Sequence, residues 1–160
     1  MRTASAVVTS SSGSLGRALQ AILTAGLICG VLDGLSALAV SGVSWLRLFQ
    51  YIASGLLGPK SFQGGVNTAF LGISLHFVVA LGAATVYYVA SRGLTFMVHQ
   101  AVLSGVLFGI AVQLFMTFIV VPSSAIGRRP FVLRSFIVMM IVHMVVVGPS
   151  IALTVRHYSR

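Results

Sequence analysis

Four long apolar runs limit what this chain can fold into. They cover residues 18–43, 68–90, 97–121 and 131–155. An α-helix crosses the roughly 30 Å hydrocarbon core of a bilayer in about 20 residues, so each run is long enough to span it. A helix also bonds all of its backbone polar groups within one segment, as lipid requires. The sequence therefore predicts an all-α integral membrane protein built as a four-helix bundle.

The scarcity of charge supports this prediction and limits the domain organisation. Charged residues make up 7% of the chain, whereas soluble domains carry about 25%. Too few charges remain to cover a water-facing surface, so the lipid bilayer is the expected partner. Residues 17–160 are predicted to form a single transmembrane domain, preceded by a disordered N-terminal tail at residues 1–16, which are mostly small and polar.

The net charge of +9 does not indicate a nucleic-acid-binding protein. The arginines lie mainly at the ends of the apolar runs, where their side chains reach lipid headgroups. Lys and Arg number five on the side of the termini and five on the other side, so the positive-inside rule gives no orientation. The expected location is a cell membrane, with several crossings.

The connection between the first two runs, residues 44–67, has the pattern of a short amphipathic helix. Apolar residues recur at helical spacing from Trp45 onward, whereas Arg47 and Gln50 fall on the other face. This pattern predicts an interfacial helix at the headgroup level, with Trp45 as its anchor. A re-entrant turn through residues 52–58 is the alternative.

The single acidic residue, Asp33, lies inside the first apolar run. A carboxylate at the centre of a membrane helix costs about 2.5–3.5 kcal/mol on insertion scales, so it needs a compensating partner. The depth of each polar residue in the membrane follows from its distance to the midpoint of its run, at about 1.5 Å of rise per residue. On this count Asp33, His76, Gln113 and His143 fall within one layer. The sequence predicts a buried polar layer in which a histidine holds Asp33.

Small residues accompany these polar groups at every third or fourth position. Such stripes let helix backbones approach closely and mark the faces turned toward other helices. The residues predicted to pack the helices in this way are Gly26, Gly30, Gly34, Gly72, Gly105 and Gly109.

Two interpretations of the polar layer follow. In the first, the four groups bond to one another and fix helix register, at about 0.6 kcal/mol per interhelical bond on average. This suits a structural or accessory subunit of a larger membrane complex, or a homo-oligomer. In the second, they form a transport site or a proton or ion relay, because intramembrane ionisable groups mark such pathways and histidine titrates near neutral pH.

Two further alternatives involve a ligated group. Haem bound by His76 and His143 would make the chain a redox protein, although their depths differ by about 5 Å. A divalent metal held by Asp33, His76 and His143 has suitable ligand types, but no His-x-x-x-His or Glu-x-x-His spacing supports it. Neither a cofactor nor catalytic residues are predicted, because the chain has one acid and lacks glycine-rich phosphate-binding motifs. We therefore expect that it is not an enzyme.

Several segments resemble a family of small bacterial inner-membrane proteins with four helices and no known function. They are Asp33–Ala37, Gln50–Gly58, Gly72–Phe77 and Val121–Ser124. The resemblance extends over most of the chain from Ala25 to about Ala152. It implies the same fold and a bacterial inner-membrane location, with no activity to transfer. It also implies that residues 50–58 cap the polar layer as a re-entrant hairpin.

Overall fold

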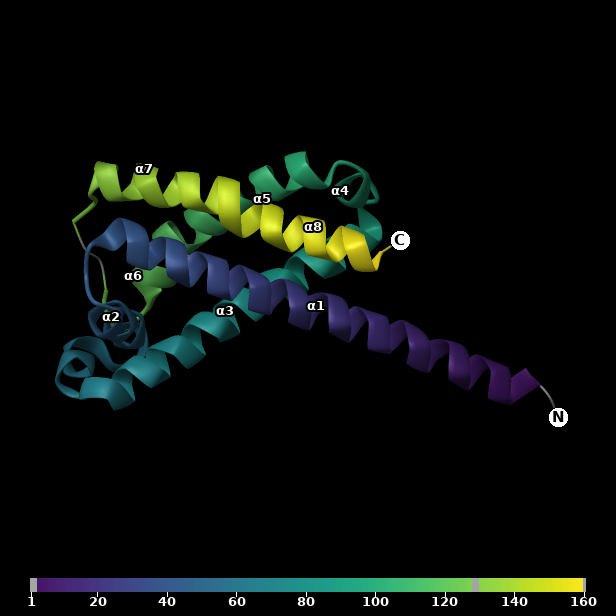
Figure 1. The fold of residues 1–160 in the computed structure, drawn as a ribbon, viewed down its shortest axis with the longest axis horizontal. Coiled ribbons are helices and arrows are strands. Elements are labelled where there is room, and N and C mark those ends of the chain that lie inside the picture. The colour runs from purple at the N-terminus through teal and green to yellow at the C-terminus, as the bar shows by residue number, and fades with distance from the viewer. Residues whose placement is uncertain (1–2, 128–129, 160) are drawn as a thin grey trace.

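The computed structural model describes residues 3–127 and 130–159, with side chains from Leu15 onward, and shows an all-α bundle (Figure 1). Within these residues, four helical stretches are long and apolar enough to cross a membrane. They are Leu15–Ser41, Gly65–Gly93, Ala101–Ser123 and Leu133–Tyr158. The predicted four-span architecture is confirmed. Four of the arginines counted for orientation lie outside the described residues, namely Arg2, Arg128, Arg129 and Arg160.

The first and second spans are single helices, whereas the third and fourth are each built from several pieces. The first span belongs to α1, which begins inside the stretch predicted to be a disordered tail. Short helices lie in the first two connections between spans. In chain order, the elements are α1 (Thr3–Ser41), α2 (Trp45–Leu57), the 3₁₀ turn η1 (Gly58–Gln63), α3 (Gly65–Gly93), α4 (Phe96–His99), α5 (Ala101–Phe115), η2 (Met116–Val120), α6 (Val121–Ser123), α7 (Leu133–Val142), η3 (His143–Val147) and α8 (Gly148–Tyr158).

The third and fourth spans each contain a π-helical turn placed just before a proline. η2 ends two residues before Pro122, and η3 ends two residues before Pro149. A proline has no N–H, and its ring clashes with the carbonyl four residues back in a regular α-helix. A wider π turn accommodates this interruption, and such turns are frequent at functional sites. The kink predicted at Gly148-Pro149 therefore takes the form of a π turn.

Glycines allow close helix approach where α1 crosses α3. A side-chain carbon at Gly26 would lie 2.6 Å from a methyl of Leu81, and one at Gly30 would lie 2.6 Å from the Phe77 ring. Beyond this crossing the two helices diverge, and α2 lies across the open side of the wedge (Figure 1).

A second close approach joins the third and fourth spans. A carbon added at Gly109 would collide with the His143 carbonyl, and one at Gly148 with the Gly105 carbonyl. Here backbone meets backbone, so the two spans pack with no side chain between them. Gly72 makes the same kind of contact, with the Phe49 carbonyl of α2. These glycines lie on the faces that the small-residue stripes mark.

The end of the bundle nearest the termini is closed by a buried apolar core. The hydroxyls of Tyr87 and Ser104 lie 2.7 Å apart, and both reach the Met97 carbonyl at 3.1 and 2.9 Å. This core joins all four spans, and its buried members are Ala25, Cys29, Ala84, Tyr87, Met97, Ala101, Val147, Ile151, Ala152 and Val155.

The α2 helix packs with its polar side inward, which corrects the predicted orientation of Gln50. Ser44 caps its start by accepting a hydrogen bond from the Arg47 N–H at 3.4 Å. Gln50 is 3% exposed, and its Nε2 donates to the Gly65 carbonyl at 3.0 Å. Trp45 and Arg47 are exposed. The polar face turns inward because the first turns of α3 offer a backbone acceptor there.

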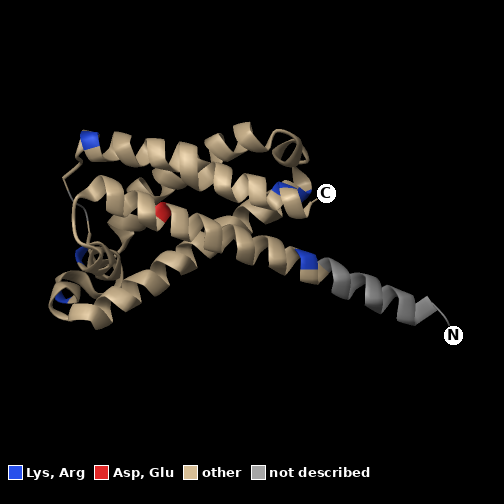
Figure 2. Cartoon of the chain, viewed as in Figure 1, with Lys and Arg blue, Asp and Glu red and all other residues tan. Residues whose placement is uncertain are grey.

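Charge and apolar surface are distributed as expected for a membrane-spanning bundle. Figure 2 shows the basic residues near the two ends and the single acidic position between them. Large apolar side chains of α1, such as Leu27, Val31 and Leu35, are half or more exposed. In lipid these side chains contact acyl chains. α1 begins and α8 ends at the same end of the bundle (Figure 1), as four crossings require.

Candidate functional site

A cavity of ≈ 850 Å³ lies among the four spans, at the end of the bundle where α2 packs. Along α1 it reaches from Cys29 to Ser41, about 18 Å at 1.5 Å per residue. That is more than half of the roughly 30 Å hydrocarbon core. Its outer end is formed by the exposed residues Ser41, Gly42 and Arg134. The cavity therefore extends from the bundle end deep into the span region.

The four polar residues predicted to share a layer all line this cavity. Asp33 comes from α1, His76 from α3, Gln113 from α5 and His143 from η3. The depth count from the sequence thus brings together residues that the structure also brings together. Their hydrogen bonds, however, differ from the prediction.

Asp33 has no partner among the residues that the structure describes. Its Oδ1 atom is buried without a hydrogen bond, and neither oxygen has a hydrogen bond or ion pair within the part of the chain that the structure describes. The side chain as a whole is half-buried, at the wall of the cavity. An ionised carboxylate at this depth is costly without compensation. The described residues supply no such compensation.

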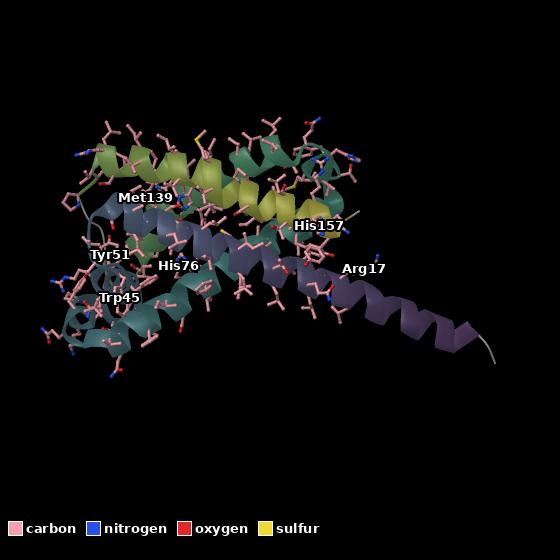
Figure 3. The ribbon with its side chains drawn as sticks, viewed as in Figure 1. Arg17, Trp45, Tyr51, His76, Met139 and His157 are labelled. Carbon is pink, nitrogen blue, oxygen red and sulfur yellow. The ribbon has the colours of Figure 1, made fainter. Side chains whose placement is uncertain are left out.

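Both histidines bond to backbone carbonyls. His76 lies between α1 and α3 (Figure 3), and its Nε2 donates to the Gly30 carbonyl at 2.8 Å. His143 Nδ1 donates to the Met139 carbonyl of its own helix at 2.8 Å. A carbonyl only accepts, so these two nitrogens carry protons. The other nitrogen of each ring, Nδ1 of His76 and Nε2 of His143, has no hydrogen bond within the described residues.

Gln113 also bonds locally, since its Nε2 donates to the Thr117 hydroxyl one turn further on at 3.2 Å. The structure therefore shows no buried layer of mutually bonded groups around Asp33, contrary to the sequence prediction. The reason lies in the glycine stripe. Gly30 has no side chain to shield its carbonyl, so His76 meets the backbone of α1 before it reaches the carboxylate.

Two aromatic rings flank Gly34, the residue next to Asp33. A side-chain carbon at Gly34 would lie 3.5 Å from His76 Nε2 and 4.0 Å from Cζ of Phe49. The Phe49 and His76 rings meet edge to face, with centroids 6.1 Å apart. α2 thus contributes Phe49, and also Tyr51, to the cavity wall.

Sequence reasoning missed several residues of the cavity wall. Neither Phe49, in the predicted interfacial helix, nor Arg134 was singled out from the sequence, yet both line the cavity. Thr117 and His143 lie in the π turns η2 and η3, which also contribute to the wall. The sequence signal for these two turns is the pair of prolines, Pro122 and Pro149, each of which follows a π turn.

No metal centre is formed by the predicted ligands. Within residues 3–127 and 130–159, no group of three His, Cys, Asp or Glu side chains lies close enough to hold a metal ion. Asp33, His76 and His143 share a cavity but do not converge on one point. The haem alternative at His76 and His143 stays a prediction.

Comparison with known protein families, with curated proteins and with solved structures finds no match to this chain. The resemblance to four-helix inner-membrane proteins therefore identifies no family. What the structure supports is the coarser description. This chain is a small multi-pass membrane protein whose four membrane-length apolar helices pack as a bundle.

Proposed function

We propose that this chain is a small membrane transport protein that moves a cation, the proton included, by way of Asp33. The observation that carries the proposal is the Asp33 carboxylate, which lines a cavity at membrane depth and bonds to none of the described residues. Intramembrane ionisable groups that face such cavities are typical of ion pathways and proton relays. A purely structural polar layer favours bonds between its members, and Asp33 makes none.

The two histidines support a role in moving protons. Each has one ring nitrogen fixed on a backbone carbonyl and a second nitrogen without a protein partner. Both side chains line the same cavity as Asp33. Histidine exchanges protons near neutral pH, so a ring held in this way is suited to pass a proton across the cavity. The proposal needs no resident cofactor and no catalytic residue.

The asymmetry of the bundle also fits transport. The cavity reaches exposed residues at the end where α2 packs, whereas the buried core around Tyr87 closes the end nearest the termini. A transport cycle requires the end of the bundle that this core closes to open as well. The proposal places the protein in a bacterial inner membrane, as the resemblance implies.

Proton flux into liposomes tests this function. Protein is reconstituted into vesicles with an internal pH dye, and a potassium diffusion potential drives protons inward. We expect the wild type to acidify the vesicles faster than protein-free vesicles, and Asp33→Asn to lower the rate to that of protein-free vesicles. Ser36→Ala is the matched control, because the Ser36 hydroxyl bonds to its own helix at Leu32 and does not line the cavity. Equal flux through wild type and Asp33→Asn would contradict the proposal.

A further inference from the structure

We infer, resting on the transport function above, that the cavity binds a monovalent organic cation with an apolar body. In this assignment Asp33 holds the charge and the surrounding wall holds the body. The charge, the wall chemistry and the dimensions of the cavity support this ligand class.

The charge of the ligand follows from Asp33. Among the residues that line the cavity, it is the only acid, and it has no competing protein partner. A positively charged group beside it would donate a charge-assisted hydrogen bond to the carboxylate or form a direct ion pair with it, and these are the stronger polar contacts in a low-dielectric site. One unpaired carboxylate matches one positive charge.

The body of the ligand follows from the wall. Most lining residues are apolar or small, including Val79, Val112 and Val138. The Phe49 ring also lines the cavity, and its Cζ would lie 4.0 Å from a side-chain carbon added at Gly34, so an aromatic side chain is part of the wall. Cations are attracted to aromatic faces, most strongly when desolvated. Sites for small organic molecules are typically apolar cavities of about 300–1,000 Å³ with few polar groups, and this cavity falls within that range.

A hard metal cation suits this cavity poorly. Ca²⁺ and Mg²⁺ take six or more oxygen ligands, usually from several carboxylates or from retained water. The described residues offer a single carboxylate and no cluster of three metal-ligating side chains. An organic cation, in contrast, needs one counter-charge and an apolar surface.

Among the described residues that line the cavity, Arg134 is the one Lys or Arg, and it opposes a cation. It lies at the exposed outer end of the cavity, with Ser41 and Gly42. Coulomb energy falls as 1/r, so a cation in contact with Asp33 is attracted more strongly than a charge at the outer end repels it. Water at the outer end screens Arg134 further. Asp33 therefore determines the sign of the charge that the ligand carries.

A pair of probes with the same shape and opposite charge tests this inference. Labelled tetraphenylphosphonium and tetraphenylborate are equilibrated with the protein in nanodiscs of neutral lipid, and binding to protein-free nanodiscs is subtracted. We expect saturable binding of tetraphenylphosphonium that Asp33→Asn weakens by about tenfold or more, the size of effect that loss of one charge-assisted contact gives. Ser36→Ala should leave it unchanged, and Arg134→Gln should leave it unchanged or tighten it.

The opposite pattern overturns the inference. If tetraphenylborate binds saturably, and Arg134→Gln weakens it while Asp33→Asn does not, the cavity is an anion site. Equal binding of tetraphenylphosphonium to wild type and Asp33→Asn also overturns it. Where Asp33→Asn does not fold, the wild type alone decides, because unlabelled tetraphenylphosphonium, and not tetraphenylborate, must displace the labelled cation.

The result is separable from the transport test, since the proton-flux assay contains no organic cation. Asp33-dependent proton flux without cation binding would overturn this inference and leave the proposed function standing. Asp33-dependent cation binding without any flux would overturn the proposed function and leave this inference standing.

Discussion

At the residue scale, the direction of hydrogen bonding explains why Asp33 is left without a partner among the described residues. Carbonyls of a helix keep a spare lone pair, so donors such as His76 and Gln50 bond to the backbone wherever glycine exposes it. A carboxylate only accepts, and the N–H groups in mid-helix are already used. The sequence thus placed at similar depth four residues that line one cavity in the structure. It could not show their partners, because the backbone itself competes for every donor.

Gln50 provides the prediction at this scale. Gln50→Leu keeps the side-chain volume but removes the donor to the Gly65 carbonyl, which still accepts a bond from Thr68. We expect a loss of about 0.5–1.5 kcal/mol in stability, typical of one buried hydrogen bond. The measurement is thermal unfolding by circular dichroism in detergent. Gln63→Leu, at an exposed position, is the control and should have little effect. Similar midpoints for the two variants would show that the Gln50 bond does not hold α2.

At the scale of elements, the sequence predicted the helices better than their faces. Length and apolarity alone locate the spans, because lipid permits little else at that depth. The inward polar face of α2 was not predictable, since an amphipathic pattern does not say whether its polar side meets water or a neighbouring backbone. The π turns were indicated only indirectly, through Pro122 and Pro149. Glycine stripes predicted which helix faces pack, and the crossing angles that open the cavity come from the packing itself.

Gly72 tests the packing of α2 on α3. A side-chain carbon there would collide with the Phe49 carbonyl, a backbone atom that cannot move aside alone. We expect Gly72→Ala to lower stability by about 1–3 kcal/mol, as overpacked sites do. Gly82→Ala is the matched control on the same helix, because nothing lies within 4 Å of the added carbon. Its unfolding midpoint should stay the same or rise slightly, since alanine favours helix over glycine by about 0.5–1 kcal/mol. Equal loss in both variants would contradict the close approach.

At the scale of the whole molecule, the bundle has a packed end and an open end. The buried core joins all four spans near the termini, while α1 and α3 diverge toward α2 around the cavity. The sequence predicts four crossings with both termini at one end, and the structure agrees. The cavity was not predictable, because its volume depends on how far α1 and α3 diverge beyond their glycine crossing. Because the cavity leaves room for a ligand beside Asp33, this carboxylate is a candidate binding group.

The most direct test of this account is whether water reaches the cavity wall beside Asp33. In a Cys29→Ala background, Ala37→Cys places a thiol on the cavity wall, and Leu35→Cys places one on the lipid-facing side, where Leu35 is 59% exposed. A charged, membrane-impermeant methanethiosulfonate reacts with thiolates, which form only where water reaches them. The account predicts rapid modification at position 37 and none at position 35, measured in intact proteoliposomes by mass shift. A thiol at position 37 that stays as unreactive as the one at position 35 would show a dry cavity and contradict the account.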